Sequence, residues 1–598
     1  MQLNALDWLI IGLNFALVLG VGLWVAKRSG KDTDSFFLGR RTMPWWLLGA
    51  SMVATTFSAD TPNLVTDIVR QNGVAGNWVW WAFLVSGMIT VFLYSRLWRR
   101  SGVMTDMEFY ELRYDGRSAA FLRGFRALYL GLAFNVIVLS VVCLAAIKIG
   151  QVMLGLTPVQ TIVIASVLTA VLSCTGGFLG VLLTDVVLFV TAMVGSILAA
   201  WYALGHPDVG GLSGLLAHEN VRDHLRLVPT MFEDGVLTSD FIKLMFVPLA
   251  VQWWASWYPG AEPGGGGYIA QRMLAAKSEN HALGATLMFN VAHYALRPWP
   301  WILVALCSLI VYPDLASLQA AFPQVAEKSV GHDLAYPAML TFLPHGVLGL
   351  VVASLAAAFI STVSTHLNWG ASYLVNDSYK RFVKPDASER ELVWVGRVVT
   401  VLTMALAALL ALQLENALQI FNFILMFGAG SGLIFMLRWF WWRVNAPAEI
   451  AAMVGSGVVA LCMTQTSLGV MIPDPWDFPF AVLLTTAIWV TTMFLTAPVG
   501  AERLASFVEK LNPAGSGWDR VRAGLPNPSR EPDSLKLGLL GALLGCVVVY
   551  SALFGIGFLI YGRMAEAGMA GAICVVSSLL LTGLLRSGAG QAKIEHGP

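Results

Sequence analysis

Four hydroxyl groups interrupt an otherwise apolar stretch, AAAFISTVSTHL, at residues 356–367. On a helix, Ala358, Ser361, Thr362 and Thr365 share one face, and Ser364 lies at its edge. A single Ser or Thr in such a helix usually bonds back to a carbonyl one turn earlier. Four hydroxyls on one side instead favour a surface of neutral oxygens for a hard, weakly charged cation. Na⁺ fits that chemistry better than a divalent ion, which would usually recruit more carboxylates.

Asp185, in the apolar sequence GVLLTDVVLF, is the carboxylate best suited to join these hydroxyls. It lies about seven residues into an expected helix, or roughly 10 Å from its cytoplasmic end at 1.5 Å per residue. An ionisable group at that depth is costly and indicates function. The alternative is a water-exposed residue in an inner vestibule.

The composition indicates that these residues lie in a lipid bilayer. The 598 residues are 57% hydrophobic and 12% charged, with a mean hydropathy of +0.69. Because apolar runs of about 20 residues recur throughout, we predict an all-α integral membrane protein with about 15 transmembrane helices. They are expected near residues 7–26, 45–70, 77–98, 123–154, 159–175, 178–203, 239–257, 281–312, 340–378, 392–414, 416–438, 446–466, 478–498, 536–562 and 567–586.

Two of these helices carry residues that break a helix at mid-membrane depth. The second contains ATTFSADTPNL (54–64), and the seventh ends in SWYPGAEPGGGGY (256–268). One such break can be an ordinary kink, but each of these opens a five-helix unit. Paired breaks in two halves are typical of the binding site of an inverted-repeat transporter. Because five is odd, the second unit is expected to have the opposite orientation.

The expected organisation follows from these breaks and from the basic residues. Arg and Lys follow the first, third and ninth helices, which places those connections in the cytoplasm, the N-terminus outside and the C-terminus inside. The expected units are an N-terminal extra helix and loop (1–44), a first repeat (45–203), an extracellular loop (204–238), a second repeat (239–438), two accessory helices (439–498), a cytoplasmic loop (499–535) and a C-terminal pair with its tail (536–598).

Several motifs together resemble the sodium:solute symporter family, which has the LeuT-type fold of two inverted five-helix repeats. They are DSFFLGRR (34–41), GASMVATTFSAD (49–60), TGGFLGVLLTD (175–185), YIAQRMLAAKS (268–278), AAFISTVST…NDSYK (357–380) and GR (396–397). The resemblance covers the first eleven or twelve predicted helices. It implies a cell-membrane protein that transports sodium together with a small polar solute.

The resemblance also implies ion ligands. A first sodium would be held by the carbonyls of Ala54, Phe57 and Ala358 and by the hydroxyls of Ser361 and Thr362. A second site, found in some members, would use Asp185, Ser361, Ser364 and Thr365. One or two co-transported sodium ions are therefore expected.

The solute pocket is less well defined, because the Pro/Gly-rich stretch at 259–267 departs from relatives. Candidate pocket residues are Thr56, Asp60, Thr61, Tyr258, Arg297 and Asn422. Arg297 could instead pair with Glu262 or Asp60. Lys148 could extend to the outer interface. For His366, an interhelical hydrogen bond is favoured over a proton relay.

Among function classes, a sodium-coupled symporter accounts for the breaks, hydroxyls and Asp185 together. A channel would need a continuous polar pore, and an enzyme would need a nucleophile–base pair or a metal motif. Proton coupling, or a transport-deficient sensor on the same fold, is the alternative. The expected partners are the bilayer and a small solute, with no nucleic acid and no obligate protein partner.

Overall fold

The computed structural model describes residues 3–26, 38–255, 264–415, 417–466, 469, 471–525 and 532–591. Regular structure in these ranges is helical, apart from the hairpin of β1 (Phe232–Glu233) and β2 (Val236–Leu237) and one isolated bridge between Met43 and Ala276. The predicted all-α class is therefore confirmed for the described part of the chain.

The first half contains α-helices joined by short 3-10 and π-helical turns, labelled η. In order they are α1 (Ala5–Ala26), η1 (Gly39–Arg41), α3 (Trp45–Thr56), α4 (Asp60–Asn72), η2 (Val74–Asn77), α5 (Trp78–Trp81), α6 (Leu84–Ile89), η3 (Thr90–Tyr94), α7 (Ser95–Ser101), α8 (Glu108–Arg113), α9 (Gly116–Leu128), η4 (Tyr129–Phe134), α10 (Asn135–Ile149), η5 (Gly150–Leu154), α11 (Pro158–Leu204), α12 (Gly211–Ala217), α13 (Glu219–Arg222) and η6 (Asp223–Leu225).

The second half follows the β hairpin and has the same character. It consists of α14 (Ser239–Phe241), η7 (Ile242–Phe246), η8 (Pro248–Gln252), α15 (Gly267–Ala275), α16 (Glu279–Val291), η9 (Ala292–Leu296), α17 (Pro298–Val311), α18 (Leu315–Ala321), η10 (Glu327–Ser329), η11 (His332–Leu334), α19 (Ala335–Leu340), α20 (Val347–Ser372), η12 (Tyr373–Val383), α21 (Glu389–Ala411), α22 (Ala417–Phe440), α23 (Ala446–Gln465), α25 (Asp477–Leu495), α26 (Ala501–Leu511), η13 (Ser516–Trp518), α27 (Asp519–Arg522), α28 (Leu535–Ile560) and α29 (Met564–Gln591).

The predicted count of about 15 spans is not confirmed by the length and composition of the described helices alone. Among the described residues, 10 helices are long and apolar enough to span a membrane, or 11 if the two bent parts of α22 count as one. Further apolar helical stretches cover residues 5–21 of α1 and 158–169 of α11. Two further segments, α3–α4 and α14–α15, are interrupted.

The predicted break in the second helix lies between α3 and α4. The first half-helix ends at Thr56, and Phe57 leaves the helical region with φ −86° and ψ 74°. The second half-helix starts at Asp60, with Pro62 in its first turn, where a missing backbone N–H costs little. The other predicted break lies partly at residues 256–263, outside the described ranges; η8 ends before it and α15 begins after it.

Residues 158–204 form one helical run of 47 residues, whereas the sequence predicted two helices that separate near residue 176. The expected boundary contains Gly176 and Gly177. Glycine lowers helix stability by only about 1 kcal/mol relative to alanine, so it does not by itself end a helix. Asp185 therefore lies inside a continuous helix.

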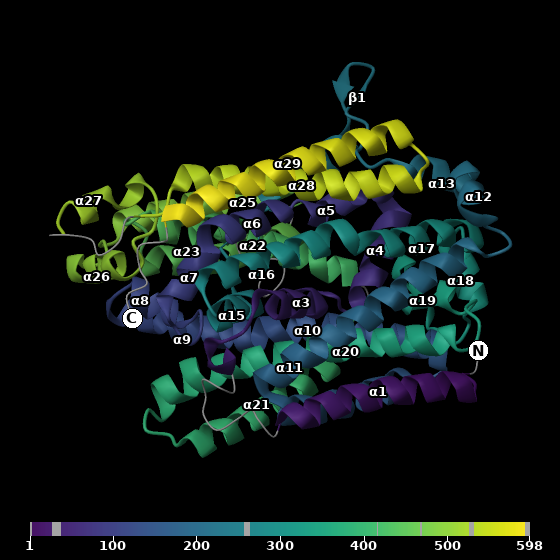
Figure 1. Ribbon diagram of the computed structural model, residues 1–598, viewed down its shortest axis with the longest axis horizontal. Coiled ribbons are helices and arrows are strands. Elements are labelled where there is room, and N and C mark those ends of the chain that lie inside the picture. Colours follow the sequence, from purple (N-terminus) through teal and green to yellow (C-terminus); the bar gives the residue numbers. More distant parts are fainter. Residues whose placement is uncertain are drawn as a thin grey trace.

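Most helices run along the long axis of the molecule (Figure 1). The short helices α12, α13 and α18 gather at one end, and α26 and α27 lie at the other. The chain enters α1 at the first end, and α29 finishes at the second, so the two terminal helices finish at opposite ends. The sequence predicts the N-terminus outside and the C-terminus inside the cell, and that prediction requires the two terminal helices to end at opposite ends of the molecule.

Helix α20, which carries the hydroxyl cluster, lies in the interior and packs against α1, α3, α10, α11 and α21. Its close approach to η4 depends on Gly370. A Cβ added there would lie 2.7 Å from the carbonyl oxygen of Gly131 and would also meet the Asn135 side chain. The missing side chain therefore lets the two helices approach closely.

We expect Gly370→Ala to lower the melting temperature of the solubilised protein. The added methyl group must push α20 away from η4, and overpacking of this kind costs about 1–3 kcal/mol. Gly12→Ala on α1 is the control, because a Cβ there meets nothing within 4 Å. Equal melting curves for the Gly370→Ala and wild-type proteins would contradict the close approach.

Candidate functional site

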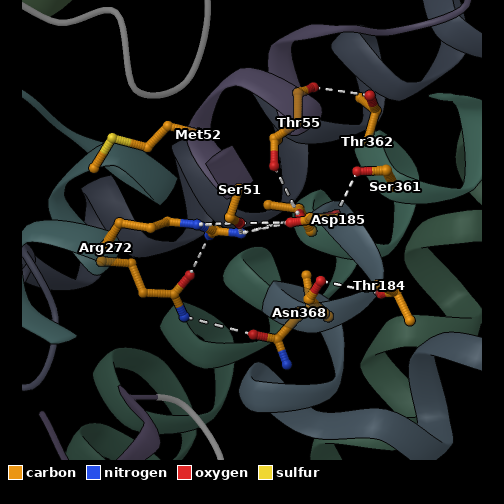
Figure 2. Close-up of polar contacts among 12 residues, drawn as sticks. Ser51, Met52, Thr55, Thr184, Asp185, Arg272, Ser361, Thr362 and Asn368 are labelled. Atoms are coloured by element: carbon orange, nitrogen blue, oxygen red, sulfur yellow. Dashed lines mark hydrogen bonds and ion pairs between the residues drawn. The ribbon is translucent and has the colours of Figure 1, made fainter. Parts of the chain in front are cut away.

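Asp185 is the centre of a buried polar cluster formed by three helices. Its carboxylate is 0% exposed and accepts hydrogen bonds from Ser361 Oγ on α20 and from Ser51 Oγ on α3, each at 2.5 Å. Figure 2 shows these side chains directed toward one another. Asp185 itself comes from α11, and it is not exposed to an inner vestibule in this structure.

The hydroxyl groups of α20 also meet the broken end of α3. Thr362 Oγ1 donates to the carbonyl oxygen of Thr55 at 2.8 Å, and the hydroxyls of Thr55 and Thr365 lie 3.2 Å apart. The carbonyls at the end of a helix lack partners in the next turn and carry the negative end of the helix dipole. A cation is therefore favoured at this junction.

The other predicted ligands of a first sodium lie on the two sides of the same junction. Ala54 and Phe57 are buried at the break, and Ala358 is buried one turn before Ser361 on α20. The carbonyl of Ala54 accepts the N–H of Phe57 at 3.1 Å. A carbonyl or hydroxyl oxygen with one hydrogen bond still has a lone pair for a metal ion.

Arg272 on α15 adds a buried positive charge to the cluster. Its Nη2 atom lies 3.1 Å from Ser51 Oγ, 3.2 Å from Thr365 Oγ1 and 3.8 Å from Asp185 Oδ2. Its Nη1 atom donates to Gln271 Oε1 at 2.9 Å. The guanidinium therefore faces the oxygens predicted for a second sodium (Figure 2).

Arg272 is not among the residues predicted for the site, although it lies in the motif YIAQRMLAAKS. A basic side chain in a short, mostly apolar segment was the available signal. Ser364, the remaining residue predicted for the second site, is buried on the same helix as Ser361 and Thr365. The structure thus brings the predicted residues together, but with a guanidinium among them.

A separate cavity of about 70 Å³ lies beside the break in α3 and α4. Its polar lining consists of Thr56, Ser58, Asp60, Thr61, His293 and Arg297, and its apolar lining includes Leu64 and Val65 of α4 and Val138 and Val141 of α10. Four of the six predicted solute-binding residues therefore share one cavity. Asn422 is exposed and is not among the lining residues, and Tyr258 lies outside the described residues.

Arg297 is held at the cavity wall by Thr56 and His293. The Thr56 hydroxyl donates to the helix carbonyls of Met52 and Val53, so its oxygen accepts from Arg297 Nη1 at 3.1 Å. By the same logic His293 Nδ1, 3.2 Å from that oxygen, acts as a donor. Its Nε2 atom then faces the guanidinium at 3.5 Å as an acceptor.

The two predicted roles of Arg297 can now be compared with its surroundings. Its charge acts on the carboxylate of Asp60, one of the two predicted partners, while Glu262 lies outside the described residues. The guanidinium carbon lies 5.7 Å from the Phe57 ring centre and 5.1 Å from that of Trp301, distances typical of cation–π contact. Arg297 is thus a buried cation at the edge of the cavity.

The prediction that Lys148 extends to the outer interface is wrong. Its Nζ atom forms a buried ion pair with Asp333 Oδ2 of η11 at 2.6 Å. A charged side chain on an apolar helix reaches water only if nothing covers the helix end, and here η11 covers it.

The interhelical hydrogen bond predicted for His366 is confirmed, because its Nδ1 atom lies 2.7 Å from Asn135 Oδ1 on α10.

Further polar contacts connect α15 to η12, which directly follows α20. Asp106 accepts the backbone N–H of Gly267, the first residue of α15, at 2.9 Å, and the hydroxyl of Tyr373 bonds to the same carboxylate. Nearby, Arg123 pairs with Glu111 at 2.6 Å. Partial burial raises the pKa of Glu111, but hydrogen bonds from Arg381 and Arg123 hold it below its ordinary value.

Comparison with known proteins connects this geometry to a family. The model of the sodium:solute symporter family matches residues 36–456. A sodium/glucose cotransporter of Vibrio parahaemolyticus is 27% identical over 507 residues, which cover 83% of this chain and 91% of the relative. Sodium/glucose cotransporter 1 of Oryctolagus cuniculus is 24% identical over 488 residues, covering 75% and 70% respectively.

The comparison with solved structures agrees. A Na⁺-coupled sialic acid symporter, solved in a substrate-bound outward-open state, has a TM-score of 0.64 at 20% identity, covering 83% of this chain and 99% of that one. This likeness confirms the predicted LeuT-type fold class. The relatives are transporters and not enzymes, as predicted. Because the family model matches most of its length, the chain belongs to the sodium:solute symporter family.

Proposed function

We propose that this multi-pass membrane protein carries out sodium-coupled symport of a small polar organic solute by alternating access. The observation that carries the proposal is the junction of α3 and α20, where Thr362 Oγ1 meets the Thr55 carbonyl at 2.8 Å. Each side of this junction supplies oxygens suited to Na⁺. In the proposed arrangement the two sides belong to opposite repeats, residues 45–203 and 239–438, with the N-terminus outside and the C-terminus inside.

The coupling mechanism follows from this division of ligands. The proposed first sodium is held by the carbonyls of Ala54 and Phe57 on one side and by Ala358, Ser361 and Thr362 on the other. If the two repeats rock apart, these oxygens separate and the ion loses its ligands. Sodium therefore stabilises the conformation in which α3 and α20 are in contact, through its different affinity for the two states.

A second sodium at Asp185, Ser361, Ser364 and Thr365 would meet the charge of Arg272. Two unit charges about 4 Å apart repel by roughly 4 kcal/mol at an effective dielectric constant of 20. The guanidinium already faces Thr365 and Asp185. We therefore propose that the first site carries the coupling ion and that a second ion requires Arg272 to turn away.

The proposed solute site is the cavity next to the first sodium site. Thr56, which lines the cavity, follows Thr55 directly, so solute and ion share the end of α3. Asp60 Oδ1 and Ser58 Oγ are buried, and apart from the interaction of the Ser58 hydroxyl with the Asp60 carboxylate they have no hydrogen-bond partner among the described residues. A solute that donates hydrogen bonds would satisfy both. The sodium/glucose cotransporters among the relatives make hexoses the first solutes to test.

Removing the hydroxyls of α20 tests the sodium site. We expect Ser361→Ala combined with Thr362→Ala to abolish sodium-stimulated uptake into proteoliposomes. The sodium concentration needed for half-maximal thermal stabilisation should rise at least tenfold, which corresponds to about 1.4 kcal/mol of binding free energy. Ser354→Ala is the matched control, because that buried hydroxyl on α20 donates to Val351 of its own helix. If the double variant keeps full sodium dependence, the assignment fails.

Changes in the cavity should affect the solute and not the ion. A solute can first be identified by its thermal stabilisation of the protein, with sugars, amino acids, nucleosides and carboxylates as candidates. Asp60→Asn should then lower the kcat/KM for transport of that solute at least tenfold, because a buried carboxylate acceptor is lost. Sodium-dependent stabilisation should remain. Asn422→Ala, at an exposed position of α22, is the control. An unchanged kcat/KM for Asp60→Asn would place the solute elsewhere.

A further inference from the structure

Four charged side chains form a cluster away from the proposed ion and solute sites. This outer cluster consists of Asp67 and Arg70 on α4, Lys148 on α10 and Asp333 on η11, all of them buried. The charge of Asp67 interacts with those of Asp333, Lys148 and Arg70. Two acids and two bases balance one another, so the cluster needs no bound ion to be neutral.

The shortest contact in the cluster joins segments far apart in the sequence. Lys148 Nζ lies 2.6 Å from Asp333 Oδ2, with side-chain exposures of 1% and 3%. Lys148 belongs to the proposed first repeat and Asp333 to a connection within the second. A pair this deeply buried has lost its hydration, so removing one partner would leave the other charge uncompensated.

Arg70 makes the second connection. It donates to the carbonyl oxygens of Ser308 and Tyr312 at the end of α17, at 2.8 Å each, and to His332 Nδ1 at 3.2 Å. These carbonyls belong to the last turn of a helix, where a cation is favoured. The outer end of α4 is therefore fastened both to α17 and to the segment that carries Asp333.

The position of the outer cluster relative to the cavity gives it a role. Helix α4 contributes Asp60 and Leu64 to the cavity wall and then continues to Asp67 and Arg70. Helix α10 likewise contributes Val141 and then continues to Lys148. Seven helical residues span about 10 Å. The cluster thus lies one to two turns beyond the cavity on two of the helices that form its wall.

We propose that the Lys148–Asp333 ion pair is the outer closure of the transport path: it is formed when the cavity is sealed and broken when the cavity opens outward. This inference rests on the proposed alternating-access function. A buried ion pair suits such a closure, because both charges regain hydration when they separate, which offsets the attraction that is lost. The contact can therefore form and break in every cycle.

The test measures access to the cavity from outside. Leu64→Cys places a reporter thiol on α4, and a membrane-impermeant thiol reagent is applied to intact cells. In this background, Lys148→Met and Asp333→Asn should each raise the labelling rate at least tenfold. The charge swap, Lys148→Asp with Asp333→Lys, should return the rate to within about threefold of the Leu64→Cys parent.

The matched control is another Lys–Asp pair of nearly equal length. Lys243 Nζ lies 2.7 Å from Asp474 Oδ2, but the two side chains are 54% and 59% exposed. Lys243→Met should leave the labelling rate unchanged, because surface pairs of this kind contribute little. Lys148→Arg, which keeps the charge, should also label like the parent.

Two results would overturn the proposed closure: neutral variants that label no faster than Lys243→Met, or a swapped pair that labels as fast as the neutral variants. Asp333→Asn is nearly isosteric and keeps the test open if Lys148→Met does not reach the membrane. Absence of a sodium response in the wild-type protein would count instead against the proposed symport. The labelling ratios and the sodium response are therefore separate outcomes.

Discussion

The contact on which the site depends is the one between the broken end of α3 and the hydroxyls of α20. In a continuous helix, the carbonyl oxygen of Thr55 would accept a hydrogen bond from a backbone N–H in the next turn. The break leaves that carbonyl to the Thr362 hydroxyl, 2.8 Å away. Backbone without helical partners survives at this depth only where buried protein groups or a cavity satisfy it. The same break places Thr56, Asp60 and Thr61 around the adjacent cavity.

Charges inside the protein are arranged as oppositely charged neighbours. Arg272 lies 3.8 Å from Asp185, Lys148 lies 2.6 Å from Asp333, and the charge of Arg297 acts on Asp60. An isolated charge at such depth would be very costly, so each has an opposite charge nearby. Contacts that join distant segments can also change partners during a conformational cycle, which makes them suited to control access.

Membership in the sodium:solute symporter family and the geometry of the site are independent arguments that agree. The family model matches residues 36–456, which include α3, α11, α15 and α20, the four helices that meet at Asp185. The relatives carry sodium together with sugars, according to their names. For this chain we propose that the neighbouring cavity, with its buried acid and guanidinium, determines solute selectivity.

The membrane environment, the all-α class and the break at residues 54–64 could be predicted from the sequence, because hydropathy and helix-breaking residues act locally. The same is true of the polar residues Asp185 and the hydroxyl cluster within apolar helices, whose role stays a prediction. The number of spanning helices stays a prediction, since interrupted segments such as α3–α4 and α14–α15 have the same composition as full spans. The contacts of Arg272 with Asp185 and of Lys148 with Asp333 are visible only in the folded chain. These contacts join residues 87 and 185 positions apart, and their formation depends on how helices pack, which no local pattern records.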